Sequence, residues 1–393
     1  MLKNLLNKNY LIFGSAIIGT RALEYLVLFF AAHYLSKDNY GELEYYKKLI
    51  EVGSSVFAFG LPALIISYTK SRESKQYFFL LSVLFVLFIF ILSIPILGLF
   101  NWLFLLIPFV FYALFFNGGI TPAYLLVIKG SNYASIYKII VSIFFYLILF
   151  ISIYYFDITA KAYVITSYFL LPLAIIYIIY EIYNQKIVKI KAQKYWGLFR
   201  KLLISSSTLV VSNFANLMFL YTDIFLIQMI SENSKSEIAD FSFALNIATM
   251  LLLIPITMVQ VDIETLKSNK LYFSILNRKI FLLTIIFSVF LIGVYYFLIN
   301  AFFDKYANTF YLFLVLLAAK LFHSFSSLFG TYLLILKKFK LNLCINIASL
   351  LTNIVLCYFG YFNFGLIGLA SASLISLLMR YFALYYFKGK YSN

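Results

Sequence analysis

The feature that most constrains this chain is a succession of apolar runs, each long enough to cross a membrane as a helix. A spanning helix needs roughly 20 consecutive apolar residues, and short polar connections separate the runs. We therefore predict an all-α polytopic membrane protein with neighbouring helices packed antiparallel. The twelve expected spans are 10–34, 45–69, 77–99, 102–127, 133–156, 162–183, 203–229, 238–261, 277–300, 310–336, 341–361 and 365–387.

Composition agrees with a membrane location and excludes a soluble nucleic-acid-binding protein. The chain is 64% hydrophobic and only 12% charged, whereas soluble domains are nearer half apolar and a quarter charged. The formal net charge of +16 is attributed to basic cytoplasmic loops, so we predict no nucleic-acid partner. Lys3 and Lys8 resemble the start of a signal peptide, but the following run is too long and carries two charges. We interpret it as an uncleaved first span.

Basic residues gather in alternate connections, which predicts the orientation. With the N-terminus in the cytoplasm, the opposite loops hold only Lys37, Lys161, Lys235 and Lys305. This positive-inside bias predicts that both termini are cytoplasmic. The cytoplasmic connections then contain Lys70, Arg72, Lys75, Lys129, Lys186, Lys189, Lys191, Lys194, Arg200, Lys201, Lys267, Lys270, Arg278, Lys279, Lys337, Lys338 and Lys340, followed by Lys388 and Lys390.

The chain is expected to consist of two related halves. We predict an N-terminal six-helix bundle over 1–185, a basic cytoplasmic linker over 186–200 and a C-terminal six-helix bundle over 201–393. Tyr124-Leu-Leu-Val-Ile-Lys129 and Tyr332-Leu-Leu-Ile-Leu-Lys337 end equivalent spans in the two halves. Because each half has six spans, the repeats would have parallel topology.

The first span carries two charges near its middle, Arg21 and Glu24. An arginine at the bilayer centre costs about 2.5–3.5 kcal/mol on insertion scales, so it needs a partner charge or a water-filled cavity. The two residues are three apart and share a helix face. They either neutralise each other, or Arg21 faces a cavity and receives an anionic group while Glu24 positions it or exchanges a proton.

The second span opens with Glu44, Lys47, Lys48 and Glu51, whose spacing places them on one helix face. One interpretation is an amphipathic turn at the outer interface, with lysines reaching the headgroups. The other is that this face lines the outer part of a cavity. Lys47 and Lys48 would then bind substrate, and Glu51 would be a charge partner.

The second half carries its own intramembrane charges. Lys320 and His323 lie three residues apart near the middle of the tenth span, which contains no acid. A buried lysine at that depth is a functional-site hypothesis by default. Asp223 and Asp240, in spans seven and eight, either act as coupling or charge-partner residues or simply sit at the interface.

Motifs of enzymes and of metal or nucleotide sites are missing from the sequence. It contains neither G-x-x-x-x-G-K-[ST] nor G-x-G-x-x-G, and neither a Gly-x-Ser-x-Gly elbow nor a metal-spaced histidine cluster. Cys344 and Cys357 lie in one apolar segment and do not suggest a disulfide framework. We therefore predict a protein that is not an enzyme and that uses no cofactor or metal.

Several short motifs together resemble those of the polysaccharide-unit flippases of the Wzx type, which belong to the multidrug/oligosaccharidyl-lipid/polysaccharide (MOP) exporter superfamily. These motifs are Gly19-Thr-Arg21, Leu35-Ser-Lys-Asp-Asn-Tyr40-Gly41, Gly60-Leu-Pro62, Ile238-Ala-Asp240 and Ile254-Pro255-Ile-Thr-Met-Val-Gln-Val261. The resemblance covers the whole twelve-span layout. Arg21 matches the first-span arginine of related flippases.

This resemblance implies two six-helix bundles in a V, as in MATE transporters, around a cationic central cavity. It also implies transport by alternating access. The substrate would be an undecaprenyl-pyrophosphate-linked oligosaccharide, an O-antigen or capsule repeat, moved to the outer leaflet of the bacterial cytoplasmic (inner) membrane. Membrane lipids, polysaccharide polymerase and assembly proteins, and an H⁺ or Na⁺ counter-ion are the partners that follow.

Two other functions stay open from the residues. A cation-coupled multidrug exporter of the same superfamily would depend on Glu24 or Asp223, because acids at such positions fit that class. An integral-membrane polysaccharide polymerase or glycosyltransferase is disfavoured, because such enzymes usually need a sizeable extramembrane loop and this chain has none.

Overall fold

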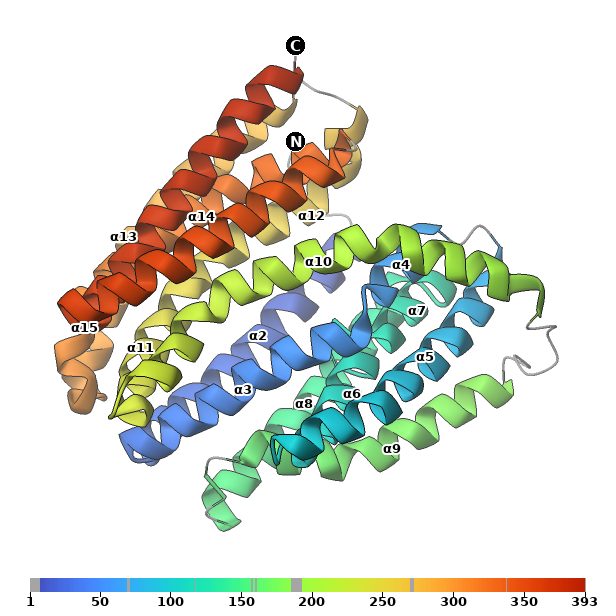
Figure 1. Ribbon diagram of the computed structural model, residues 1–393, viewed down its shortest axis with the longest axis horizontal. Helices are drawn as coiled ribbons and strands as arrows, with labels where there is room; N and C mark the ends of the chain where they lie inside the picture. The colour runs from blue at the N-terminus through green and yellow to red at the C-terminus, as the bar shows by residue number, and fades with distance from the viewer. Residues whose placement is uncertain are drawn as a thin grey trace. The chain divides into compact units, whose positions relative to one another are not determined.

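The computed structural model describes residues 8–68, 71–116, 118–156, 158–159, 161–184, 193–268, 272–336 and 338–392, and all of its regular structure is helical (Figure 1). No β-strand occurs in these ranges. The predicted fold class is confirmed. Helices are the expected solution, because hydrocarbon offers no hydrogen-bond partner to an unpaired peptide group.

The chain divides into two compact units, each described here by itself. The first combines residues 1–31 with 46–210, and the second combines residues 32–45 with 211–393. The expected division at a basic linker remains a prediction, and Lys186, Lys189 and Lys191 lie outside the described residues.

The first unit contains α4 to α9 entirely, together with parts of α2, α3 and α10. Within it, α7 packs against α4, α5 and α8, and α6 packs against α5 and α9. The bounds of the helices are α2 Lys8–Tyr34, α3 Lys37–Ala58, α4 Leu61–Tyr68, α5 Arg72–Leu99, η1 Leu103–Leu105, α6 Leu106–Leu114, α7 Ile120–Ile128, α8 Ser131–Phe156, α9 Ala162–Asn184 and α10 Gln193–Ile230. The last of these continues into the second unit.

The second unit is built around α14, which packs against α11, α12, α13 and α15. The further helices are α11 Ser234–Thr249, η3 Met250–Leu252, α12 Leu253–Ser268, α13 Tyr272–Ala301, η4 Asp304–Thr309, α14 Phe310–Ile335 and α15 Phe339–Ser392. The last element is two helices that meet at Gly365, whose φ of 58° and ψ of −141° lie in a region that glycine alone occupies readily.

The twelve predicted spans correspond to these helices in chain order. Among the described residues, seven helices are long and apolar enough to cross a membrane by themselves, and α15 covers two of the predicted spans. Other spans are interrupted. The second breaks between α3 and α4 at Phe59 and Gly60, both with positive φ, and the fourth and eighth break just before the helices that contain Pro122 and Pro255.

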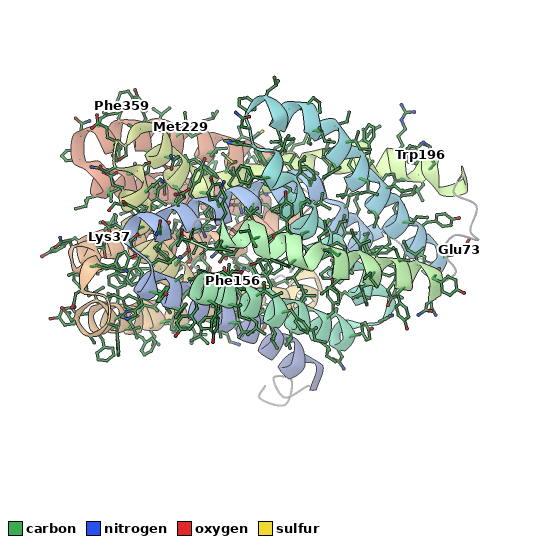
Figure 2. The ribbon with its side chains drawn as sticks, turned by 90° about the horizontal axis from the view of Figure 1, so that it is seen from below. Lys37, Glu73, Phe156, Trp196, Met229 and Phe359 are labelled. Carbon is green, nitrogen blue, oxygen red and sulfur yellow. The ribbon has the colours of Figure 1, made fainter. Side chains whose placement is uncertain are left out.

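Large apolar side chains remain exposed on the outer faces of the helices, as a bilayer-embedded protein requires. On α5, for example, Phe88, Ile91 and Leu92 are more than half exposed. Phe156, Met229 and Phe359, which Figure 2 labels, are also exposed apolar side chains. In water such continuous apolar surface would drive aggregation, whereas lipid tails cover it without cost.

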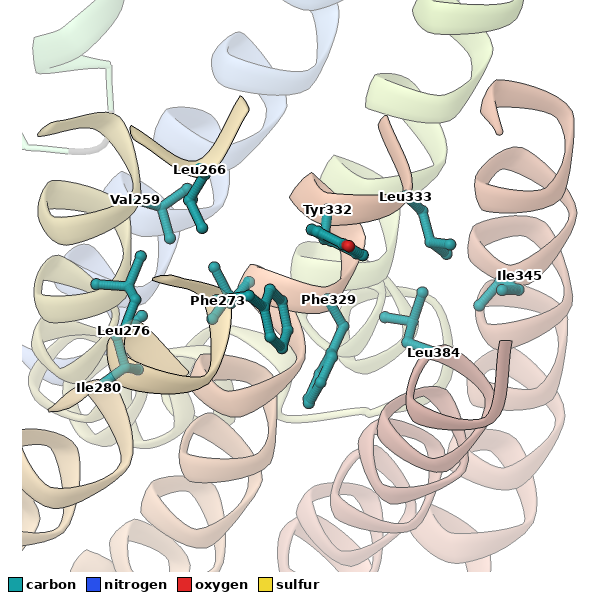
Figure 3. Packing of buried hydrophobic residues seen from close by; sticks show 11 residues of the cluster. Val259, Leu266, Phe273, Leu276, Ile280, Phe329, Tyr332, Leu333, Ile345 and Leu384 are labelled. Carbon is teal, nitrogen blue, oxygen red and sulfur yellow. The ribbon is translucent and has the colours of Figure 1, made fainter. Parts of the chain in front are cut away.

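One part of the interior of the second unit is an aromatic-rich apolar cluster. Phe273 and Tyr332 lie with their ring centroids 4.7 Å apart, and Phe329 lies 5.6 Å from Phe273. Figure 3 shows these rings between Leu276 of α13 and Leu384 of α15. The cluster fixes one end of α13, α14 and α15 relative to one another.

Residues 32–45, which include the turn between α2 and α3, are joined to the rest of the second unit by polar contacts with α11. Lys37 Nζ lies 2.7 Å from Asp240 Oδ1, and Lys235 Nζ lies 2.8 Å from Glu42 Oε2. Gly41 allows the helices to approach this closely, because a Cβ there would stand 1.8 Å from the carbonyl oxygen of Lys235. The Leu35–Gly41 motif therefore has a packing role.

We expect Gly41→Ala to lower the apparent melting temperature of the detergent-solubilised protein. The added methyl group must push α3 and α11 apart, and overpacking of this kind costs about 1–3 kcal/mol. Gly293→Ala on α13 is the matched control, since a Cβ there would meet nothing within 4 Å and alanine is the better helix former. Equal melting temperatures for the two variants would contradict the close-packing role of Gly41.

Candidate functional site

The predicted pair of Arg21 and Glu24 forms on α2. Arg21 Nη1 donates a hydrogen bond of 2.6 Å to Glu24 Oε2, one helical turn away. The Glu24 side chain is only 8% exposed, whereas that of Arg21 is 50% exposed. The carboxylate is therefore an interior group, and the guanidinium extends from it to a more open surface.

Glu24 has a second cation partner that arrives from another helix. Lys47 Nζ of α3 lies 2.8 Å from Glu24 Oε1, and its side chain is only 4% exposed. The charge of Lys48 also acts on Glu24, and Lys48 is itself buried. The alternative that these lysines reach outward to headgroups does not describe Lys47, whose ammonium points to an interior carboxylate.

Two positive groups on one carboxylate leave a net positive charge. Glu24 carries one negative charge and can neutralise only one of Arg21 and Lys47. Lys47 is the more deeply buried of the two, so its charge depends more on this carboxylate. Arg21 therefore keeps donors and charge available toward its exposed side. This arrangement suits recognition of an anion, because a guanidinium binds phosphate and carboxylate oxygens in a planar, bidentate manner.

Buried tyrosines complete the surroundings of this cluster. Tyr112 of α6 and Tyr146 of α8 lie within electrostatic range of both Glu24 and Lys47, and the charge of Glu51 also acts on Tyr112. We name Arg21, Glu24, Lys47, Lys48 and Glu51 together the N-terminal charge cluster. The sequence did not single out these tyrosines, since 34 tyrosines are distributed along the chain.

The second unit holds a separate polar network centred on Asp223 of α10. Ser373 donates to the carboxylate, with Oγ 2.9 Å from Oδ1 and 2.8 Å from Oδ2. Cys357 Sγ lies 3.3 Å from Oδ1, and Asn353 Nδ2 lies 3.5 Å from it. Asp223 is only 4% exposed, so it is an interior residue and not an interfacial one.

Lys320 and His323 lie beside this network, buried on α14. Their exposed fractions are 5% and 8%, and the charge of Lys320 acts on Asp223. The tenth predicted span, α14, has no acid of its own, and the acid near Lys320 is Asp223 of α10. Ser326 donates to the His323 carbonyl over 2.8 Å, whereas the His323 ring Nδ1 is buried without a hydrogen-bond partner among the described residues.

Asp240 is placed apart from these groups in the second unit. It pairs with Lys37, the residue labelled near the start of α3 in Figure 2. This pair belongs to the contacts that hold residues 32–45. The expected coupling or charge-partner role of Asp240 remains a prediction, and the partner that the structure gives it is a packing contact.

An apolar groove lies on the first unit between α6, α8 and α9. Its volume is about 340 Å³, and its lining is almost entirely apolar, with Phe115, Ile140 and Leu173 among the side chains. Near one end, Tyr177 of the lining donates to Glu181 over 3.2 Å, and Glu181 also binds Lys129. Burial lowers the pKa of Lys129, but the bond to Glu181 outweighs it and the net pKa is raised.

No group of three or more metal-ligating side chains that could hold an ion occurs in the part of the chain that the structure describes. The charged side chains instead form ion pairs and hydrogen bonds with one another. Their chemistry is that of binding and charge compensation.

Comparison with known proteins identifies the family. A family described as "Polysaccharide biosynthesis protein" matches residues 6–263. The chain belongs to this family. No match to the chain is found among curated proteins.

Solved structures show which fold the family member adopts. The chain is similar to a mutant of the Vibrio cholerae MATE transporter VcmN, with a TM-score of 0.61, 12% identity, and coverage of 99% of this chain and 96% of that one. A multidrug resistance MATE family transporter of the MOP superfamily, solved in an inward-facing conformation, matches with a TM-score of 0.59, 13% identity and coverage of 94% of each chain. The fold is that of MATE transporters.

The family match and the fold confirm the predicted resemblance to the MOP superfamily. The apolar helices and the family make it a multi-pass membrane protein with the fold of MATE transporters. Among the site residues predicted from the sequence, the structure brings Arg21, Glu24 and Lys47 into contact. It also places Lys320 near Asp223.

We expect Lys47→Met to destabilise the protein by roughly 3–5 kcal/mol, the range found when a buried ion pair loses one partner. Glu24 would then keep the half-exposed Arg21 as its ion-pair partner and the more distant charge of Lys48. The double variant Lys47→Met with Glu24→Gln should recover much of that loss, because it removes both buried charges. Thermal unfolding in detergent of the wild-type protein, Lys47→Met, Glu24→Gln and the double variant gives the four stabilities that the comparison needs.

Lys235→Met is the matched control for this experiment. Its pair with Glu42 is more exposed, at 54% for the lysine side chain, and exposed pairs contribute about 0–1 kcal/mol. If the effects of Lys47→Met and Glu24→Gln were simply additive, the direct coupling between these two side chains would be disproved.

Proposed function

We propose that this protein is a flippase for a lipid-linked oligosaccharide. It would move an undecaprenyl-pyrophosphate-linked sugar unit, an O-antigen or capsule repeat, from the cytoplasmic to the outer leaflet by alternating access. Phosphates would be received by the cations of a hydrated cavity. The observation that carries this proposal is the excess of positive charge inside apolar helices of a chain from a polysaccharide biosynthesis family.

The charge balance of the N-terminal charge cluster supports an anionic substrate. Arg21 and Lys47 both contact Glu24, so two positive charges meet one negative charge at this carboxylate. Keeping an excess charge within the membrane is costly, and a phosphate would remove that cost on binding. Arg21 is the residue proposed to make first contact, because its guanidinium is the exposed member of the cluster.

The energetics of transport agree with this substrate. A headgroup with about two negative charges that moves outward against an inside-negative potential gains roughly 4–5 kcal/mol per 100 mV. The obstacle is the passage of charge and sugar through hydrocarbon. A wet cationic site lowers that barrier while the lipid tail stays in the bilayer, where an apolar surface groove such as that near Phe115 and Leu173 is available.

The topology proposed with this function has both termini in the cytoplasm and the protein in the bacterial inner membrane. The basic connections support it by the positive-inside rule. Polysaccharide polymerase and assembly proteins are the proposed partners on the outer side. H⁺ or Na⁺ would be the counter-ion, with Glu24, Glu51 and Asp223 as the acids that could exchange with it.

We expect Arg21→Ala and Lys320→Ala each to abolish surface polysaccharide in cells that depend on this chain, with the amount of membrane protein unchanged. Each substitution removes a cation proposed to receive the pyrophosphate. Gel analysis of surface polysaccharide gives the readout, with immunoblotting of membranes for protein amount. Lys390→Ala, at an exposed C-terminal position, is the control and should leave the polysaccharide intact. Full activity of both core variants would reject the cationic-site mechanism.

The second candidate is a cation-coupled multidrug exporter, and the MATE fold of the solved relatives favours it. It predicts that deletion of the chain sensitises cells to drugs and that Glu24→Gln or Asp223→Asn reproduces the sensitivity. The flippase proposal predicts unchanged drug sensitivity together with accumulation of lipid-linked oligosaccharide in the inner leaflet. Measuring both in one deletion strain separates the candidates.

A further inference from the structure

A basic residue that the sequence analysis did not single out lies deep inside the second unit. Arg380 is in the second part of α15, beyond the break at Gly365, and is only 9% exposed. Its guanidinium carbon lies 5.8 Å from the centre of the Phe219 ring of α10. Phe219 forms a small apolar cluster with Ala319 and Leu377, so one side of this guanidinium faces side chains of low polarity.

The contacts of Arg380 orient its guanidinium without neutralising it. Its Nη2 donates to Asn216 Oδ1 over 3.1 Å and to Asn346 Oδ1 over 3.0 Å. Both acceptors are neutral amides. A guanidinium has five N–H donors, and the donors on Nε and Nη1 are buried without a hydrogen-bond partner among the described residues.

Other nitrogen-bearing side chains lie close to this guanidinium. The charges of Arg380 and Lys320 both act on His323, whose Nδ1 is buried and likewise without a partner in the described residues. Asp223 is the acid near Lys320, and it already accepts hydrogen bonds from Ser373. The described surroundings of Arg380 itself include no ion pair, and its hydrogen-bond acceptors are neutral.

This combination is costly for a purely structural element. A buried hydrogen-bond donor without an acceptor has lost its bonds to water without replacement, and the loss is greater when the group is charged. A buried charge with neutral partners is rare unless it binds something. The same apolar surroundings strengthen its attraction to an anion, because the effective dielectric constant is low.

We propose that Arg380, fixed by Asn216 and Asn346 and assisted by His323 and Lys320, forms a phosphate-binding subsite inside the second unit. The ligand chemistry is a phosphate or pyrophosphate group with several oxygens to accept the free N–H donors. The inference rests on the proposed function in taking that group to be the headgroup of the lipid-linked substrate. The chain would then hold two separate phosphate-binding places, one at Arg21 and one at Arg380.

Native mass spectrometry of the full-length protein in detergent tests this subsite. The probes are undecaprenyl pyrophosphate, undecaprenol without phosphate, and inorganic pyrophosphate, and the variants are Arg380→Gln, Arg380→Lys and the control Lys390→Gln. We expect Arg380→Gln to weaken binding of undecaprenyl pyrophosphate about tenfold or more, as for loss of charge-assisted hydrogen bonds. Undecaprenol binding and the Lys390→Gln variant should be unchanged.

Arg380→Lys keeps the charge and provides the test if Arg380→Gln does not fold. It should still weaken binding severalfold, since an ammonium lacks the planar arrangement of donors. Binding of undecaprenyl pyrophosphate at wild-type strength by both variants would overturn the subsite. So would an equal loss of undecaprenol binding, which would show a packing effect.

Two further outcomes separate this inference from the proposed function. If the wild-type protein binds undecaprenyl pyrophosphate no better than undecaprenol, the flippase proposal and the subsite fail together. If it binds well and the Arg380 variants bind equally well, only the subsite fails. If inorganic pyrophosphate binds as tightly as the lipid and is lost in Arg380→Gln, the subsite stands as a phosphate site and its ligand is a free anion.

Discussion

Peptide groups and charges find no partner in hydrocarbon, and this constraint governs the structure from its backbone to its candidate sites. It makes every regular element in the described residues a helix. It also makes each interruption informative, because the backbone groups released at Phe59, Gly60 or Gly365 must be satisfied within the protein. The breaks in the second and fourth spans fall in the first unit, which also contains Arg21 and Glu24.

The same constraint explains how the interior charges are arranged. Glu24 accepts both Arg21 and Lys47, which stabilises a carboxylate that would be intolerable alone. Asp223 is treated differently, with neutral donors from Ser373 and Cys357 and a lysine nearby. At Glu24 two cations contact one carboxylate, and in the second unit Arg380 is buried with neutral hydrogen-bond partners. A protein that handles anions can retain such an imbalance, since its substrate completes the compensation.

The contacts of residues 32–45 show that short motifs can have structural causes. Lys37, Gly41 and Glu42 each meet a residue of α11 in the second unit. Tyr40 accepts a hydrogen bond from Asn246 over 3.4 Å. A motif that indicated a family in the sequence is thus explained by close packing of two helices. These contacts explain the residues of the motif without a bound substrate.

The sequence by itself determined the membrane class, the twelve spans and their helical state, because apolar runs of this length have a single solution in a bilayer. It also pointed to Arg21 and Glu24 as a pair, since their spacing of three residues is enough to place them together on one helix. Lys320 was recognisable because it is a charged residue within an apolar run, where burying a charge in the membrane is energetically costly. Arg380 carried the same signal in the twelfth run and could have been found by it.

Only the tertiary structure decided which helix supplies each partner. Nothing in the order of residues joins Lys47 to Glu24, Asp223 to Ser373 or Arg380 to Asn216, because these contacts depend on packing between helices distant in the chain. The sequence treated Asp240 and Asp223 alike, whereas the fold gives the first a lysine at the start of α3 and buries the second in a network of neutral donors. Local spacing specifies neighbours on one helix, and the directions in which helices pack specify all the others.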